Sequence, residues 1–216
     1  MMINRVLTSV AVATVLVSGA LANWNITVIN SSGVLNPPST VVSVPTLTIT
    51  NPLPQITFLT GAGTPNPIIV GNGTPFTNGT FSGAYSISPA VSSPTPLTGF
   101  NFVIAGFVDG SALITWQKKV VRNSDNAILY NKSGTIAGSG FGGTNGAFSI
   151  VLNETLSAPA TDVTVYENFL LFVLPTNPTS TAALSLVEQD WVPEPASMLA
   201  LSSGLVGLVA LRRRKR

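Results

Sequence analysis

The first half of the chain consists of short β-prone runs and carries no charged side chain. No Asp, Glu, Lys or Arg occurs from Asn23 to Val108, and eleven of the sixteen prolines fall in that stretch. Val, Ile, Thr and Phe are frequent between the prolines, glycines and asparagines, and these residues favour extended strands. No stretch repeats apolar residues at a helical spacing. The runs that we predict as strands are Trp24–Ile29, Thr40–Thr50, Gln55–Leu59 and Thr80–Ser88.

Prolines interrupt some of these runs. Pro45, Pro52 and Pro54 lie within or beside them. A proline cannot donate a hydrogen bond to a neighbouring strand, so it is confined to edge strands and bulges. We therefore expect edge strands in this part of the chain.

The second half alternates more regularly. Asp109-Gly110 separates Phe100–Val108 from Ser111–Val121 and predicts a two-residue hairpin. Trp116 shares a mainly apolar face of the second run and is expected in the core, whereas Lys118 and Lys119 are expected to be exposed or partly exposed. Further strands are predicted around 148–152 and over 162–174. Together these features predict an all-β fold, an antiparallel β-sandwich that is jelly-roll-like, over residues 23–192.

The N-terminal 22 residues have the features of a secretory signal peptide. Arg5 precedes the apolar run Val6–Val17, and Ala20 and Ala22 place small residues at the positions that signal peptidase reads. The apolar run is shorter than the ~18–20 residues that a membrane-spanning helix needs, which argues against an anchor. We expect cleavage before Asn23.

The C-terminus has three parts in order. Pro193, Glu194 and Pro195 are followed by the uncharged run 196–211, which we predict as a membrane helix. The chain then ends in a basic cluster, which is expected to stay on the cytoplasmic side. An ordinary tail anchor would explain the helix and the cluster but not the Pro-Glu-Pro. The cluster is Arg212, Arg213, Arg214, Lys215 and Arg216.

These three parts resemble the PEP-CTERM sorting signal. The resemblance covers residues 193–216 only. It implies an exported protein of a Gram-negative bacterium that makes extracellular polysaccharide, transiently anchored in the inner membrane. It also implies recognition by exosortase, a membrane-embedded enzyme similar to cysteine peptidases. About the preceding domain it implies nothing.

Composition limits the chemistry of that domain. Residues 23–193 hold four basic and seven acidic side chains, a net charge of −3, so the pI of about 9.2 reflects the two ends of the chain. Nucleic-acid binding needs clustered Lys and Arg, which this domain lacks. The chain has no Cys and no His, so it cannot form a thiol or Ser-His-Asp catalytic centre or a zinc site of the usual type. No metal or other cofactor is expected.

Carboxylates are the remaining candidates for catalysis, since a glycosidase needs two of them about 5–10 Å apart. Each candidate also has a structural interpretation: a turn for Asp109, a polar loop for Asp125, a strand start for Asp162 and a solvated strand face for Glu154 and Glu167. We favour the structural interpretations.

Two further motifs are ambiguous. Residues 138–143 match GxGxxG but are followed by a predicted strand, so we interpret them as a flexible glycine-rich loop rather than a dinucleotide site. Tyr130 and Phe141 lie near predicted loops and are candidates for stacking on sugar rings, although packing is the commoner role.

Three functions remain open. The first is a non-enzymatic surface or matrix protein, sorted by an exosortase-like enzyme and associated with extracellular polysaccharide. The second is a carbohydrate-binding or adhesive module, which requires an exposed aromatic platform. The third is a secreted carboxylate-dependent hydrolase, which requires a cleft with paired carboxylates.

Overall fold

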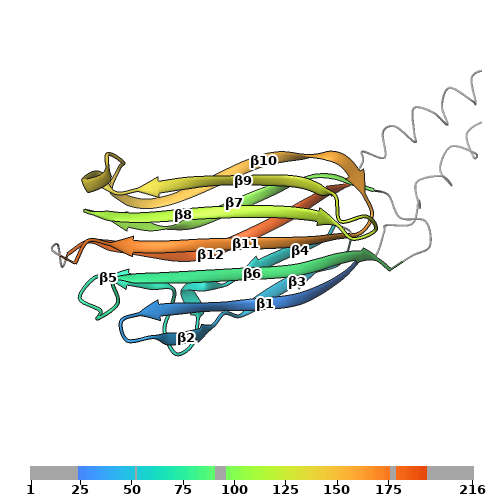
Figure 1. The fold of residues 1–216 in the computed structure, drawn as a ribbon. Coiled ribbons are helices and arrows are strands. Elements are labelled where there is room, and N and C mark those ends of the chain that lie inside the picture. Colours follow the sequence, from blue (N-terminus) through green and yellow to red (C-terminus); the bar gives the residue numbers. More distant parts are fainter. Residues whose placement is uncertain (1–23, 52, 91–95, 176–178, 194–216) are drawn as a thin grey trace, which may run out of the picture.

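Two antiparallel sheets pack face to face in the computed structural model, which describes residues 24–51, 53–90, 96–175 and 179–193 (Figure 1). Sheet A has the order β2-β1-β6-β11-β8-β9, and sheet B has the order β10-β7-β12-β4-β3 with β5 also paired to β12. The predicted antiparallel β-sandwich is confirmed. The strands of sheet A are β1 (Trp24–Asn36), β2 (Thr40–Ser43), β6 (Asn78–Pro89), β8 (Ala112–Arg122), β9 (Ile128–Ala137) and β11 (Val163–Val173). The strands of sheet B are β3 (Thr46–Ile49), β4 (Gln55–Phe58), β5 (Ile69–Gly71), β7 (Leu97–Asp109), β10 (Gly146–Ala160) and β12 (Thr181–Pro193).

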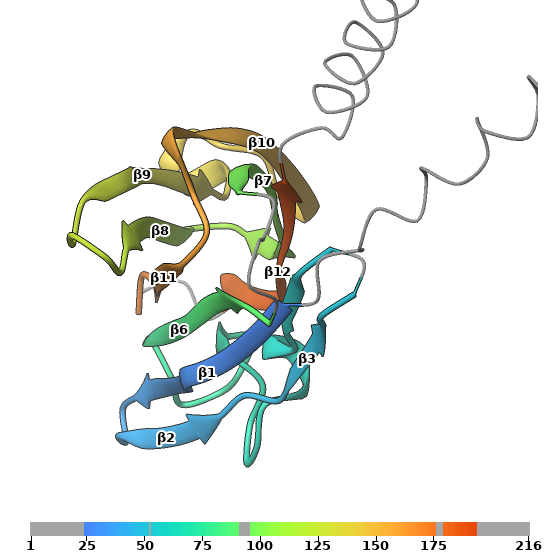
Figure 2. The ribbon, with the colours of Figure 1, turned by 90° about the vertical axis from the view of Figure 1, so that its right-hand side faces the viewer.

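The chain changes sheet at most of its connections. From β6 to β8 it passes from sheet A to sheet B and back, and from β9 to β12 it changes sheet at every step. The end-on view in Figure 2 shows the two layers that this winding produces. Strands that are neighbours in sequence therefore face each other across the core more often than they pair.

Proline divides the predicted strand Thr40–Thr50 into two. The chain leaves β2 at Ser43, and Pro45 directly precedes β3, so the two halves belong to different sheets. β2 is the edge of sheet A and β3 is the edge of sheet B, as the prolines predicted.

The predicted hairpin at Asp109-Gly110 is wrong. Gly110 does adopt a turn conformation, with φ of +59°. However, β7 pairs with β10 and β12, whereas β8 pairs with β9 and β11. The turn instead carries the chain from one sheet to the other, and its backbone is satisfied by neighbouring loops: Gly110 N–H donates to Asn145 Oδ1 at 3.0 Å, and Ser111 N–H donates to Ser180 Oγ at 2.8 Å.

Three strands, β5, β9 and β12, were not predicted. β12 is nevertheless central in sheet B, where it lies between β7 and β4. A register shift between Leu184 and Leu186 interrupts its alternation, and Gln189 places a polar side chain on its buried face. Both features weaken the period-2 signal from which a strand is recognised.

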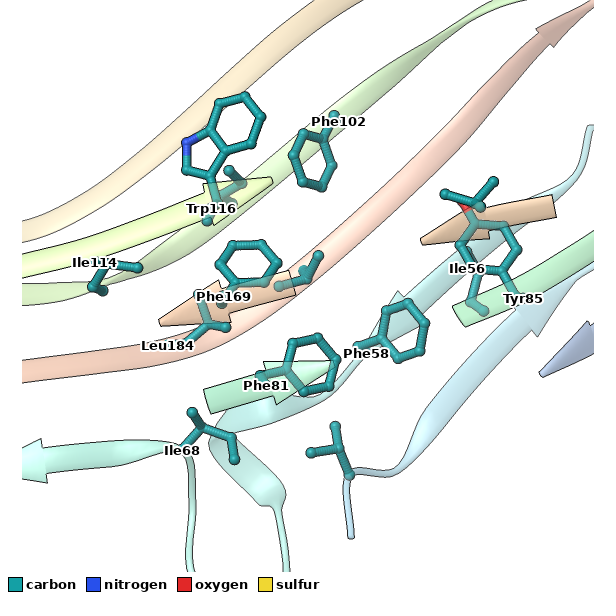
Figure 3. Packing of buried hydrophobic residues seen from close by; sticks show 14 of the residues in the cluster. Ile56, Phe58, Ile68, Phe81, Tyr85, Phe102, Ile114, Trp116, Phe169 and Leu184 are labelled. Carbon is teal, nitrogen blue, oxygen red and sulfur yellow. The ribbon is translucent and has the colours of Figure 1, made fainter. Parts of the chain in front are cut away.

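Aromatic rings form a continuous series through the core (Figure 3). Phe81 lies between Phe58 and Phe169, with ring centroids 5.4 and 5.9 Å away. Phe102 of sheet B contacts Trp116 of sheet A with centroids 5.6 Å apart in an edge-on arrangement. Trp116 is 8 % exposed, which confirms its predicted place in the core. Ring contacts between the two sheets thus hold the sandwich together.

A glycine makes room for Trp116. Gly134 is the register partner of Trp116 on the neighbouring strand β9. A Cβ atom at Gly134 would lie 2.7 Å from Cε2, Cζ2 and Nε1 of the indole, closer than real Cβ contacts. The absence of a side chain there allows the indole to lie against the backbone of β9.

Candidate functional sites

The described part of the chain begins and ends at the same end of the sandwich (Figure 1). Trp24 opens β1 opposite Pro89, and Pro193 closes β12 opposite Leu97. Trp191 fixes the end of β12, because its side chain is buried and its backbone N–H donates to Pro54 O at 3.0 Å. The chain beyond Pro193 therefore continues directly from a central strand of the folded domain.

The other predicted export and sorting residues lie outside the described residues. Among the described residues, no helix is long and apolar enough to cross a bilayer. The predicted helix 196–211 is not among them. The predicted export and sorting residues that also lie outside the described ranges are Ala20, Ala22, Glu194, Pro195, Arg212, Arg213, Arg214, Lys215 and Arg216.

Two of the candidate carboxylates lie in surface turns, as predicted. Asp125 is exposed and accepts hydrogen bonds from Arg122 Nε at 3.0 Å and Arg122 Nη2 at 2.9 Å. The Arg122 guanidinium, through these hydrogen bonds, lowers the pKa of Asp125. Asp109 ends β7 at the turn to β8. Both are accounted for by local structure.

Glu154 and Asp162 also have partners. Glu154 was predicted on a solvated strand face, but it lies on the same side of β10 as Leu152 and Leu156, which pack against the core, and its side chain is 15 % exposed. Glu154 Oε2 accepts a hydrogen bond from Lys132 Nζ at 2.6 Å, which joins β10 of sheet B to β9 of sheet A at the open flank of the sandwich. Asp162 directly precedes β11, as predicted, and accepts a hydrogen bond from Asn123 Nδ2. Within the described residues, no group of three His, Cys, Asp or Glu side chains is placed to hold a metal ion.

Four polar side chains meet inside the sandwich; we call them the buried polar cluster. Lys118 (β8), Glu167 (β11) and Tyr85 (β6) belong to sheet A, and Gln189 (β12) belongs to sheet B. Lys118 is 0 % exposed, and Glu167 and Gln189 are each 1 % exposed. Lys118 Nζ forms an ion pair with Glu167 Oε1 and donates a hydrogen bond to Gln189 Oε1. Tyr85 Oη donates to the same Gln189 oxygen at 2.5 Å.

The surroundings of the cluster are aromatic and dry. Lys118 Nζ lies 3.9 Å from the ring centroid of Phe102 and 5.1 Å from that of Phe100. Burial lowers the pKa of Lys118 to about 8, although the Glu167 carboxylate acts in the opposite direction. Burial, and then the charge of Glu167, raises the pKa of Tyr85 well above its ordinary value. The amine therefore loses its proton more readily than an exposed lysine, while the phenol holds its proton more firmly than an exposed tyrosine.

The predictions for Lys118 and Glu167 were wrong. Lys118 was expected to be exposed or partly exposed, and Glu167 was expected to solvate a strand face. Both side chains instead point inward, because each shares the parity of its strand's apolar residues: Lys118 with Trp116, and Glu167 with Val165 and Phe169. The alternation of apolar and polar residues along each strand indicated that both side chains are buried, since side chains two residues apart lie on one face. Gln189 was missed together with β12.

An open groove of about 970 Å³ crosses the outer face of sheet A. One cross-strand row in it runs Ser82, Asn168, Gln117 and Ser133 over β6, β11, β8 and β9. Ser82 Oγ donates to Asn168 Oδ1 at 2.5 Å. The residues that line the groove include no charged side chain. Hydroxyl and amide groups both donate and accept hydrogen bonds, so this surface suits a neutral, hydroxyl-rich ligand.

Of the two aromatics that were predicted near loops, Phe141 is exposed and Tyr130 is buried. Tyr130 lies within β9, is buried, and packs edge-on against Phe100 with ring centroids 4.9 Å apart, so it is not available for stacking. Phe141 is 41 % exposed at one end of the sandwich. Tyr166, which the sequence did not single out, is 43 % exposed on β11 two residues before Asn168. Its side chain therefore lies on the same outer face as the groove.

The glycine-rich segment 138–143, predicted to be a flexible loop and not a dinucleotide site, lies in the connection between β9 and β10. Residues Ser139–Phe141 make one turn of 3₁₀ helix. Gly140 N–H donates to Gly110 O at 2.9 Å, and Gly143 N–H donates to Gly138 O at 3.1 Å. Strand β10 follows at Gly146, so the segment lacks the helix that a dinucleotide site requires.

Comparison with known proteins gives a match to a family model and distant likenesses to solved structures, two of which are described below. The family model for the PEP-CTERM protein-sorting motif matches residues 192–215. No curated protein matches the chain. The CBM36-1 domain of a multidomain xylanase from the hindgut metagenome of Trinervitermes trinervoides is 12 % identical, over 74 % of this chain and 96 % of that domain, with a TM-score of 0.26. A family 11 carbohydrate-binding module from Clostridium thermocellum, in complex with a β-1,3-1,4-mixed-linked tetrasaccharide, is 11 % identical over 77 % of this chain and 88 % of the module, with a TM-score of 0.25. These TM-scores are too low for either structure to bear on the ligand of this chain.

Proposed function

We propose that this chain, which carries a PEP-CTERM protein-sorting motif at residues 192–215, is an exported, non-catalytic surface protein sorted by an exosortase-like enzyme. Its β-sandwich is the part displayed outside the cell, in or on the extracellular polysaccharide layer. Signal peptidase removes residues 1–22, and the helix 196–211 anchors the protein in the inner membrane until the tail is processed. The observation that carries the proposal is the sorting motif at the end of the chain.

The fold supports a boundary between the displayed domain and the sorting tail close to Pro193. Strand β12 ends at Pro193, and the family match begins at Val192. The sandwich is therefore complete where the sorting segment starts, so removal of the tail leaves the paired strands intact. The absence of Cys in the chain also suits an oxidising location, because no thiol can be oxidised.

Processing is testable by mass spectrometry of the surface form. We expect an N-terminus at Asn23 and the loss of residues 196–216. Glu194→Ala is expected to leave membrane insertion intact and to block removal of the tail. Glu188→Ala, a change of the same type within β12, is the control and is expected to be processed normally. A wild-type chain that keeps its tail in cells with an active exosortase would disprove the proposal.

A second candidate function is carbohydrate binding, and the uncharged groove on sheet A favours it. Its hydroxyl and amide side chains match the hydrogen-bonding groups of neutral sugars, and Tyr166 offers an exposed ring beside them. Polysaccharide of the layer in which the protein resides is the ligand that we propose.

Co-sedimentation of the exported chain with the producing organism's exopolysaccharide tests this function. Tyr166→Ala is expected to weaken binding about 3- to 10-fold, which corresponds to a stacking contribution of roughly 0.5–1.5 kcal/mol. Phe141→Ala, which removes a similarly exposed ring from the turn at one end of the sandwich, is the matched control and is expected to bind like wild type. Equal losses in the two variants would contradict binding in the groove.

A further inference from the structure

A primary amine, a carboxamide and a carboxyl group converge where the core should be apolar. Lys118 and Glu167 are register partners on adjacent strands of sheet A, and Gln189 faces them from sheet B. Two polar atoms of this group, Glu167 Oε2 and Gln189 Nε2, are buried without a hydrogen-bond partner among the described residues. Unsatisfied buried groups of this kind are destabilising, so their presence together in one place calls for a chemical role rather than a packing one.

We propose that the exported domain cross-links itself by an isopeptide bond between Lys118 Nζ and Gln189 Cδ, with Glu167 as the proton carrier. The reaction occurs once per molecule and joins sheet A to sheet B. The chain has no Cys, so a disulfide cannot provide this link.

The geometry places the nucleophile at its target. Lys118 Nζ donates a hydrogen bond to Gln189 Oε1, so the amine lies one bond away from Cδ of the carboxamide. Once it has lost its proton, the amine has to turn from this oxygen to the face of the carboxamide in order to attack Cδ. The aromatic rings of Phe100 and Phe102 line the amine and exclude water, so hydrolysis does not compete.

The remaining members of the buried polar cluster activate both reactants. Glu167 Oε1 contacts Lys118 Nζ directly and can accept its proton, which leaves the neutral amine that attacks. Tyr85 Oη donates to Gln189 Oε1 at 2.5 Å and stabilises the negative charge that develops on this oxygen during attack. Burial lowers the pKa of Lys118, which makes the neutral amine accessible.

The reaction balances without an added reagent. A proton moves from the Lys118 ammonium to the Glu167 carboxylate, and the free amine adds to Cδ of Gln189. The second Nζ proton is transferred, through Glu167, to Nε2 of the tetrahedral intermediate. The Cδ–Nε2 bond then breaks and ammonia leaves, so the products are a secondary amide, a neutral Glu167 and one ammonia.

The products suit a dry core better than the reactants. The ammonium and the carboxylate are both replaced by neutral groups, which removes two buried charges. The unpartnered NH₂ of Gln189 leaves with the ammonia. The amide N–H that is formed lies next to Glu167, which can accept its hydrogen bond.

Peptide mapping of the exported wild-type chain tests the proposal directly. Digestion with chymotrypsin followed by tandem mass spectrometry should reveal a branched peptide that joins the segments around Lys118 and Gln189. Its mass should equal the sum of the two segments less about 17 Da, the mass of ammonia. Linear peptides with free Lys118 and Gln189 alone would overturn the proposal. A branch from Lys118 to Glu167, with a loss of about 18 Da for water, would also overturn it.

Variants separate the role of Glu167 from general effects on folding. Glu167→Gln should slow formation of the branched peptide at least about 100-fold, the usual loss when a proton carrier is removed. Glu154→Gln, a carboxyl change at the flank of the sandwich, and Lys119→Arg, on the outer face of β8, should leave the branch at the wild-type level. Circular dichroism of each variant checks that it is folded. A folded Glu167→Gln chain with the wild-type extent of branching would overturn the proposed mechanism.

Discussion

Gly134 is predicted to be a position where adding a single methyl group disturbs the core. A Cβ atom there would lie 2.7 Å from three atoms of the Trp116 indole. The Trp116 ring is also held from the other side by Phe102, whose centroid lies 5.6 Å away. Because the indole has packed neighbours on both sides, it cannot move aside freely, and Gly134→Ala forces either the ring or strand β9 to shift.

The expected magnitude follows from the cost of overpacking. Gly134→Ala should lower the free energy of unfolding by about 1–3 kcal/mol. Phenylalanine lacks the indole nitrogen and the fused six-membered ring to which Cε2 and Cζ2 belong. In a Trp116→Phe background the added methyl group no longer meets these three atoms, and Gly134→Ala should lower the free energy of unfolding by less than about 0.5 kcal/mol.

Urea unfolding of the exported chain and its three variants completes the double-mutant cycle. The midpoints should shift while the m-values stay equal, because the surface exposed on unfolding is nearly unchanged. Ser133→Ala, on the exposed outer face of the same strand, is the control and should change stability by no more than about 0.5 kcal/mol. An equal effect of Gly134→Ala in both backgrounds would refute the argument, because the loss would then not arise from contact with Trp116.

Three further predictions concern charges. After refolding of the wild-type chain, the rate of cross-link formation should change little with pH up to about 8 and fall about tenfold per pH unit above it, because the mechanism uses the proton that Lys118 and Glu167 share and burial lowers the pKa of Lys118 to about 8; a rate that rises tenfold between pH 8 and pH 9 would contradict the role of Glu167 as proton carrier. Lys132→Met should lower the free energy of unfolding by no more than about 1 kcal/mol in urea titrations, because its pair with Glu154 lies at the solvated flank; a larger loss would show that the flank is part of the core. The exported chain should release no reducing ends from exopolysaccharide above the buffer level, and turnover abolished by Asp162→Asn or Glu167→Gln would establish a hydrolase instead.

The alternation of residues along β8 and β11 indicates that Lys118 and Glu167 are buried, although we predicted from the sequence that they are exposed or partly exposed. Lys118 follows Trp116 by two residues, and Glu167 stands between Val165 and Phe169 at the same spacing. Period-2 alternation alone thus places both charges on buried faces. The general preference of charged residues for solvent led to the opposite prediction, and it failed because the two charges neutralise each other.

The sequence by itself determined the fold class, the edge strands at the prolines and the sorting motif, because each depends on residues that are close together in the chain. Propensity, proline geometry and an ordered terminal motif are local properties. The Asp109-Gly110 turn is also local, and its conformation was foreseeable, but the sheets to which its two strands belong were not.

Only the tertiary structure decided which side chains meet in the core. Lys118 and Glu167 are 49 residues apart in sequence, and Lys118 and Gln189 are 71 residues apart. Alternation specifies the face of a strand on which a residue lies, but it does not specify the neighbouring strand, the register or the strand that faces it from the other sheet. Those are fixed when the two sheets close over one shared core, since packing and pairing must then be satisfied together.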